Sequence, residues 1–400
     1  MVVAGEPQRR CGVGDYARLL AGTMSTGSTS VVHMPIPFDP VSRTHLFGLM
    51  KVRQGVQRQV LSALSPRIVG STPGVVHTHY SDFSWNGVRA YEDCYELLTH
   101  QVMRLSRSAP QLFVTLHEHP WFRHRHIWDK PQTVADRLFA ILARQYPVPL
   151  SLPLEIFRRH CGIHVHHEWH KSILIDYGVP ESLVRVIPHP VPACRASPQT
   201  VDGFRQRFNL VGKRILAMTG FIFERKRYER VLNLLPQLPD DVIICLLGGA
   251  TGQSSELYLA QLVRIAEGLG VRSRLVVTGY LPGQDMNAGL LATDLFVAPY
   301  GEVSSSGSVA RCIAAGAPIV AGQCPTFDEL SEGGAGLVCV DAESPEALLS
   351  EIKRVLGDNE ARGWMIAKNR SYAERHSLGR IAEVFQAWYR ECLGTRGLHH

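Results

Sequence analysis

A run of serine and glycine, followed directly by an apolar helical pattern, contains the residues of this sequence best suited to bind an anion. The run is "SSSGSVARCIAAGAPIV", and its apolar residues recur at helical spacing from Val309 until Gly316. In a turn that opens a helix, serine hydroxyls and backbone N–H groups donate hydrogen bonds to a negative group. The residues predicted to form a phosphate-binding turn are Ser305, Ser306, Gly307 and Ser308.

Three apolar runs that predict strands in the same half of the chain end in glycine, and one is followed by a lysine. Glycine lets backbone come close to a ligand, and a lysine is a point charge suited to phosphate. Taken alone, Lys226 also fits a solvated charge in "ERKRYER". Combined with the serine turn, it indicates a diphosphate site. The residues at these strand ends are Gly220, Lys226, Gly248, Gly249, Tyr280 and Leu281.

Short apolar runs alternate with helical patterns along both halves of the chain, which predicts parallel sheets covered by helices on both faces. A segment rich in Pro, Ser and Gly separates the halves near 192–203. We therefore expect two Rossmann-like, doubly wound α/β domains over 1–195 and 200–378, with the helix at 379–395 packing back on the first. Ligands bind beyond the carboxyl ends of strands in such sheets, so the two domains should face a common cleft.

The composition narrows the class of ligand. The chain has 400 residues, of which 45% are hydrophobic and 20% charged, and a net charge of +6, which favours small anionic ligands. No basic run with interleaved aromatics indicates a nucleic-acid groove.

The nine cysteines are scattered without a CxxC, which predicts free thiols in a reducing compartment. No apolar run has the length of a membrane span or signal peptide, so we expect a cytoplasmic protein and leave peripheral membrane contact open.

The second half resembles the nucleotide-sugar half of GT-B glycosyltransferases, above all the retaining enzymes of glycosyltransferase family 4. The resemblance extends over 213–345 and rests on four segments, "GFIFERKRYERVLNLL", "LLGGA", "LVVTGYLPGQDMNAGLLATDLFVAPY" and "SSSGSVARCIAAGAPIVAG". It is weaker in the first half, where the similar segments are "CGVGDYARLLAG", "FVTLHEHPWF" and "VRVIPHPVP".

The resemblance implies that the nucleotide diphosphate lies on the second domain. Lys226 matches the family's phosphate-binding lysine, and the segment 279–281 matches the backbone that holds the base. Two positions depart from the family. Phe221 stands where an arginine is expected to bind phosphate, and Arg311 stands where a glutamate is expected to bind the ribose. Glu302 lies one place from the family's other glutamate, and we assign it to the donor sugar.

The first domain contributes residues on the sugar and acceptor side. His117 matches the family's histidine that faces the donor sugar, and Gly12 and Gly14 form a short glycine loop after the first strand that would hold the sugar. His79 ends the preceding strand and fits either the cleft or the core. The basic, aromatic segment at 121–130 fits either acceptor recognition or a solvated loop. Its candidate acceptor-side residues are Trp121 and Arg123.

These residues predict transfer of a sugar from a nucleotide-diphosphate sugar to the hydroxyl of a glycan, a lipid-linked glycan or a natural product. In a retaining reaction of the family's kind, the leaving phosphate takes the acceptor proton, and the enzyme supplies positioning and charge stabilisation. We expect no metal and no cofactor besides the donor, because no Asp-x-Asp tripeptide occurs and "HVHHEWHK" lacks the spacing of a zinc site.

Two alternatives stay open on the same fold. A nucleotide-sugar epimerase or hydrolase would place carboxylates at other strand ends, and product analysis with and without acceptor distinguishes it. A non-catalytic nucleotide-sugar binder is motivated by Phe221 and Arg311. An NAD-dependent dehydrogenase is disfavoured, because Gly12 and Gly14 do not extend to the full glycine fingerprint.

Overall fold

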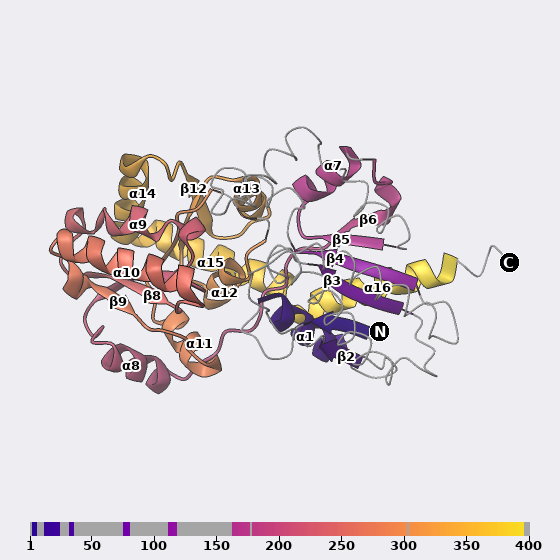
Figure 1. The fold of residues 1–400 in the computed structure, drawn as a ribbon, viewed down its shortest axis with the longest axis horizontal. Helices are drawn as coiled ribbons and strands as arrows, with labels where there is room; N and C mark the ends of the chain where they lie inside the picture. Colours follow the sequence, from indigo (N-terminus) through magenta and orange to yellow (C-terminus); the bar gives the residue numbers. More distant parts are fainter. Residues whose placement is uncertain are drawn as a thin grey trace, which may run out of the picture. The chain divides into compact units, whose positions relative to one another are not determined.

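The chain folds into two compact units, which are described separately (Figure 1). A computed structural model describes residues 2–5, 12–24, 32–35, 75–80, 111–117, 162–176, 178–301, 303 and 305–395. The first unit comprises Met1–Pro188 and Gly379–His400, and the second comprises His189–Leu378. The chain thus passes from the first unit to the second at Pro188 and returns to the first at Gly379.

The first unit contains a parallel sheet in the order β2-β1-β3-β4-β5-β6. Its strands are β1 (Val2–Gly5), β2 (Val32–Pro35), β3 (Val75–Tyr80), β4 (Gln111–Leu116), β5 (Gly162–Val165) and β6 (Val184–Val186). Its described helices are α1 (Gly12–Met24), α7 (Glu168–Asp176) and α16 (Leu378–Thr395).

The second unit contains a parallel sheet in the order β12-β11-β10-β7-β8-β9. Its strands are β7 (Arg214–Thr219), β8 (Val242–Leu247), β9 (Leu275–Val277), β10 (Leu295–Ala298), β11 (Ile319–Gly322) and β12 (Leu337–Val340). Its helices are α8 (Pro198–Arg207), α9 (Tyr228–Leu232), α10 (Gln253–Gly268), α11 (Gly283–Leu291), α12 (Gly307–Ala315), α13 (Pro325–Glu332), α14 (Pro345–Gly357) and α15 (Asn359–Arg375).

Helices cover both faces of the second sheet, which explains why its strands are almost continuously apolar. Ile243 and Cys245 of β8 pack in one buried cluster with residues of α8, α11, α12 and α13. Ile244 and Leu246 of the same strand pack in a second cluster with residues of α9, α10 and α14. The predicted α/β fold with two parallel sheets is confirmed. Of the described helices, none has the length and apolar character to span a membrane.

The glycine loop predicted around Gly12 and Gly14 is wrong in its local structure. Helix α1 already begins at Gly12, so both glycines lie in its first turn. The first N–H groups of a helix have no intrahelical partner, and glycine is therefore tolerated there better than in a helix interior. What these two residues bind stays a prediction.

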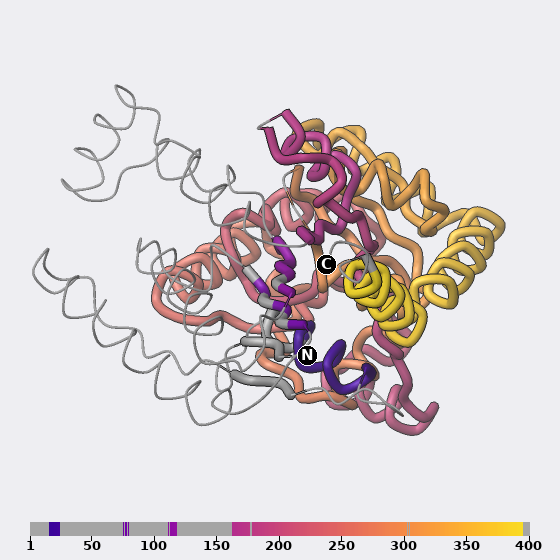
Figure 2. The backbone as a smooth tube through the Cα atoms, turned by 90° about the vertical axis from the view of Figure 1, so that its right-hand side faces the viewer, coloured from indigo at the N-terminus to yellow at the C-terminus, as the bar shows by residue number. Residues whose placement is uncertain are grey.

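The C-terminal helix α16 packs within the first unit. Figure 2 shows the yellow α16 beside the indigo α1, and Gln386 Nε2 donates to the Met24 carbonyl over 3.3 Å. Farther along α16, the Cys392 carbonyl accepts a hydrogen bond over 2.8 Å from Nε2 of Gln111, the first residue of β4. Residues 281 positions apart in sequence are thus joined directly.

A chain of buried hydrogen bonds ties α16 to three strands of the first sheet. The Tyr389 hydroxyl bonds to His77 Nδ1. His77 Nε2 lies 2.7 Å from Thr115 Oγ1, which lies 2.9 Å from His164 Nδ1, and His164 Nε2 lies 2.8 Å from the Ile187 carbonyl. Burial favours neutral imidazoles, each with one ring proton. Because the Ile187 carbonyl only accepts, the proton of His164 is on Nε2, and His164 Nδ1 accepts from the Thr115 hydroxyl. The Thr115 oxygen then accepts from Nε2 of His77, and His77 Nδ1 accepts from the Tyr389 hydroxyl.

Substituting Phe for Tyr389 is expected to lower the free energy of unfolding by about 1–3 kcal/mol, because it removes one donor from this buried chain. Urea unfolding followed by circular dichroism measures the effect. Thr115→Val, which breaks the chain in its middle, should cost a similar amount. Tyr372→Phe is a matched control, since that hydroxyl donates to no described residue. Equal stability of Tyr389→Phe and the control would contradict the assigned chain.

Candidate functional site

Three of the predicted phosphate-binding residues converge at the carboxyl edge of the second sheet. Gly220, directly after β7, has a left-handed φ of +97°. A Cβ atom at this position would lie 2.4 Å from Ser308 Oγ and 2.5 Å from Lys226 Nζ. Both polar side chains therefore occupy the space that any other residue at 220 would fill. The glycine is required here by its conformation and by this close approach.

Lys226 is a buried amine with no carboxylate partner in the part of the chain that the structure describes. It ends the 3-10 helix Glu224–Lys226 that follows β7, and it is only 6% exposed. Nζ donates one hydrogen bond, over 2.7 Å, to the Thr219 carbonyl. Among the described residues it has no other hydrogen-bond acceptor and no carboxylate partner. Burial, with a smaller contribution from the nearby Arg225 charge, lowers the pKa of Lys226 to about 7. The site thus has hydrogen-bond donors, and an amine that can be charged, for an anion that none of the described residues supplies.

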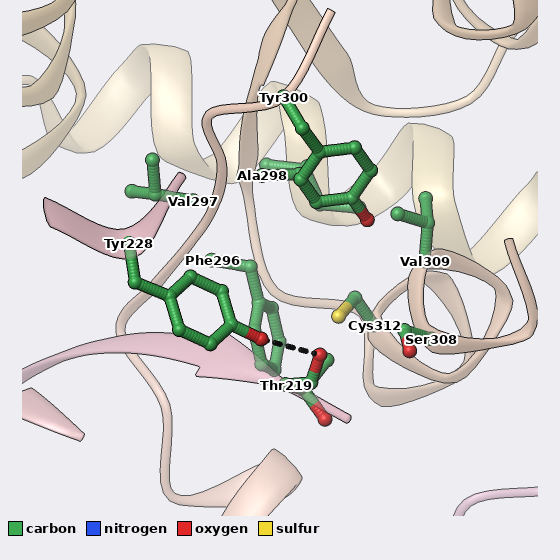
Figure 3. Close-up of a pocket in the computed structure, with 10 residues that line it drawn as sticks. Thr219, Tyr228, Phe296, Val297, Ala298, Tyr300, Ser308, Val309 and Cys312 are labelled. Carbon is green, nitrogen blue, oxygen red and sulfur yellow. Dashed lines mark hydrogen bonds between the residues drawn. The ribbon is translucent and has the colours of Figure 1, made fainter. Parts of the chain in front are cut away.

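The turn that carries Lys226 is held in place by tyrosines. Arg227 adopts a left-handed φ of +53° and turns the chain into α9. The Tyr228 N–H then donates to the Tyr258 hydroxyl over 2.8 Å, and that hydroxyl donates to Glu229. The Tyr228 hydroxyl points back and donates to the Thr219 carbonyl over 3.2 Å (Figure 3). Nothing in the spacing of the sequence indicates Tyr228 as part of the site, because it is the turn at Arg227 that brings it there.

Helix α12 presents its N-terminus to the same edge of the sheet. Ser306 caps the helix, and its Oγ accepts from the Val309 N–H over 3.2 Å. The Tyr300 hydroxyl lies 3.3 Å from the same oxygen. The helix ends at Gly316, whose φ is +76°, so the predicted helix and its stop are confirmed. The first turn contains no acid, and its N–H groups and the helix dipole favour an anion.

A small cavity of about 10 Å³ lies between β7, β10, α9 and α12, large enough for about one water. Figure 3 shows the Tyr228, Ser308 and Cys312 side chains around it. Cys312 is a poor nucleophile, because burial raises the pKa of its thiol far above the usual range. The chemistry available here is therefore anion binding by Lys226 and the serine turn.

The glycines after β8 bring two backbone segments into contact. A Cβ at Gly248, whose φ is +150°, would lie 2.1 Å from the Gly220 carbonyl oxygen. A Cβ at Gly249 would lie 3.1 Å from the Tyr280 nitrogen. Tyr280 is 51% exposed, whereas Leu281 is buried. An exposed aromatic ring beside closely packed backbone offers a stacking surface for a planar group.

The remaining predicted residues lie elsewhere. Ser305 directly precedes the cap of α12 and is half-buried. His79 and His117 lie in the first unit at the ends of β3 and β4, with His79 Nδ1 3.0 Å from His117 Nε2. Both rings are buried, with Tyr16 edge-on to each. The predicted residues outside the described part of the chain are Trp121, Arg123 and Glu302.

Two units, each with a parallel six-stranded sheet, are the architecture of the GT-B fold. Residues 212–358 match the family model described as "Glycosyl transferases group 1". This match confirms the resemblance predicted over 213–345.

Two curated proteins similar to this chain are glycosyltransferases by name. The 2-deoxystreptamine glucosyltransferase of Streptomyces kanamyceticus is 26% identical over 241 residues, 57% of this chain and 58% of that protein. A GDP-mannose-dependent alpha-(1-6)-phosphatidylinositol monomannoside mannosyltransferase of Mycolicibacterium smegmatis is 25% identical over 179 residues, 42% of this chain and 45% of that protein. These matches thus span about half the length of the curated relatives.

A solved structure supports the same fold over nearly the whole chain. Anabaena HepE, determined in complex with UDP-glucose, superposes with a TM-score of 0.66 at 14% identity. The superposition covers 98% of this chain and 99% of HepE. At 14% sequence identity, this superposition establishes the fold of the chain alone.

Proposed function

We propose that this protein is a glycosyltransferase that transfers a hexosyl group from a nucleotide-diphosphate sugar to an acceptor hydroxyl, with retention of configuration and without a metal. The observation that carries the proposal is the buried Lys226 beside Ser308 and Gly220, at the N-terminus of α12, with no carboxylate partner among the described residues. It lies within the residues that match the group 1 glycosyltransferase model. An anion with several oxygen acceptors fits these donors.

A UDP-hexose is the donor we propose. One relative is a glucosyltransferase and the similar HepE structure holds UDP-glucose, whereas the second relative depends on GDP-mannose. The named substrates of the relatives include an aminocyclitol and a phosphatidylinositol glycolipid. These names support two of the three acceptor classes that the sequence left open, natural product and lipid-linked glycan.

In this reaction the diphosphate leaves as the glycosidic bond breaks. Lys226 and the N–H groups of Gly307 and Ser308 would stabilise the charge that develops on it. A leaving phosphate oxygen would accept the acceptor's proton on the same face of the sugar, which accounts for retention without a base. The donor-sugar roles of His117, Gly12, Gly14 and Glu302 stay predictions.

The test is turnover of a donor panel with UDP-glucose, UDP-galactose and GDP-mannose, each with an aminocyclitol and a phosphatidylinositol acceptor, in the presence of EDTA. We expect a glycoside whose anomeric configuration, read by NMR, matches that of the donor. An inverted product, or turnover that needs a divalent metal, would contradict the mechanism. An epimerised or hydrolysed donor without acceptor would indicate the alternative enzyme. Binding without turnover for every acceptor would indicate a non-catalytic binder.

A further inference from the structure

His189 lies against the first residue of α12. A Cβ at Gly307 would lie 3.7 Å from His189 Nε2 and 3.9 Å from its Cε1, so the imidazole edge borders this glycine. His189 Nδ1 lies 2.9 Å from the Pro190 carbonyl. Because a carbonyl only accepts, the proton is on Nδ1, and Nε2 is the atom on the Gly307 side. Both residues belong to the second unit.

His189 and Lys226 therefore border consecutive residues of one helix N-terminus. His189 borders Gly307, and the hydroxyl of the next residue, Ser308, borders the same point as Lys226 Nζ. Lys226 is buried with a single hydrogen bond among the described residues, which independently indicates an external anion at this position. A diphosphate has two linked phosphoryl groups, and it matches two donor side chains set one residue apart along the helix end.

We propose that His189 binds the β-phosphoryl group of the donor diphosphate, while Lys226 and Ser308 bind the α-phosphoryl group, which the nucleoside monophosphate also carries. The inference rests on the proposed function and deepens it. A phosphate raises the proton affinity of an adjacent imidazole. The bound ring thus takes a proton from solvent, donating from Nε2 to the phosphate and from Nδ1 to Pro190. This contact takes the place of the phosphate contact that Phe221 cannot make.

Calorimetric dissociation constants for UDP and UMP, and for GDP and GMP, test the assignment. His189→Ala should weaken the diphosphate at least tenfold, the loss of one hydrogen bond to a charged group, and leave the monophosphate within about twofold. His189→Gln, which keeps a donor, should recover part of the loss. His376→Gln serves as the matched histidine control in the same unit.

Each other result has a defined meaning. If Lys226→Met loses diphosphate binding but His189→Ala does not, the His189 assignment fails while the proposed function stands. Equal weakening of monophosphate and diphosphate in His189→Ala would also overturn it, since that indicates a role other than the second phosphate. Weakening of UDP-glucose without weakening of UDP would move the contact to the sugar and overturn it. If wild type binds no nucleotide diphosphate, the proposed function itself fails.

Discussion

Lys226→Met is expected to weaken nucleotide diphosphate binding by about ten- to a hundredfold and to lower turnover at least tenfold. The substitution removes a charged donor, and a hydrogen bond to a charged group contributes about 1.5–3 kcal/mol. Methionine keeps an unbranched apolar chain in the space that the lysine stem fills, so the loss is assigned to the amine. Calorimetry with UDP and GDP measures affinity, and initial rates with the active donor measure turnover.

The same variant should fold at least as well as wild type. Burying an amine without an acid costs stability, and methionine removes that cost, so the melting temperature without nucleotide should stay equal or rise. Lys368→Ala, an exposed lysine on α15 whose Nζ lies 5.4 Å above the Trp364 ring, is the matched control. It should change neither affinity nor turnover. Near-normal activity of Lys226→Met would refute the diphosphate site.

Much of this site could be predicted because steric needs leave a trace in the sequence. Gly220 and Gly248 stand where a Cβ would meet Ser308 and the Gly220 carbonyl, so glycine at both strand ends records a close backbone approach. Helix α12 could be predicted from the apolar spacing that ends at Gly316. The parallel sheets follow from continuous apolar strands such as β8, because both faces are covered.

The state of Lys226 could not be predicted, since it depends on tertiary packing. In "ERKRYER" it is one of several charges, and its burial arises from the left-handed turn at Arg227 and the Tyr228–Tyr258 contact. His189 could not be predicted as a site residue from the sequence either, because more than a hundred positions separate it from Gly307. The burial of His77 and His164 in one hydrogen-bonded chain depends on pairing of β3, β4 and β5.

The contribution of Lys226 to the affinity for nucleotide diphosphate should fall by roughly tenfold for each pH unit above pH 7. In the unliganded protein burial sets the Lys226 pKa to about 7, so the amine is increasingly neutral above that pH. The bound diphosphate favours the charged amine, and binding must then take up a proton. A terminal phosphate loses its last proton near pH 6. Over pH 7.5–9 the nucleotide therefore adds little slope of its own.

The stability of the unliganded protein should change in the opposite direction. A lysine with the ordinary pKa of 10.5 stays protonated in the unfolded chain, whereas folded Lys226, with its pKa of about 7, does not. The unfolded state therefore binds more protons between pH 7 and 10. The contribution of Lys226 to the free energy of unfolding accordingly rises with pH, by up to about 1.4 kcal/mol per unit. Subtracting the same pH series for Lys226→Met isolates this contribution from other titrating groups.

Calorimetry at pH 8 in two buffers of different ionisation enthalpy separates proton uptake from other causes. Wild type should take up about one proton more per bound nucleotide than Lys226→Met. Lys226→Arg, which stays charged throughout this range, should bind with a weaker pH dependence than wild type even if its affinity is lower. A wild-type affinity that is constant between pH 7.5 and 9 would show that the amine is already charged before the nucleotide arrives. Lys226 would then need an acid partner in the unliganded protein, contrary to the environment described here.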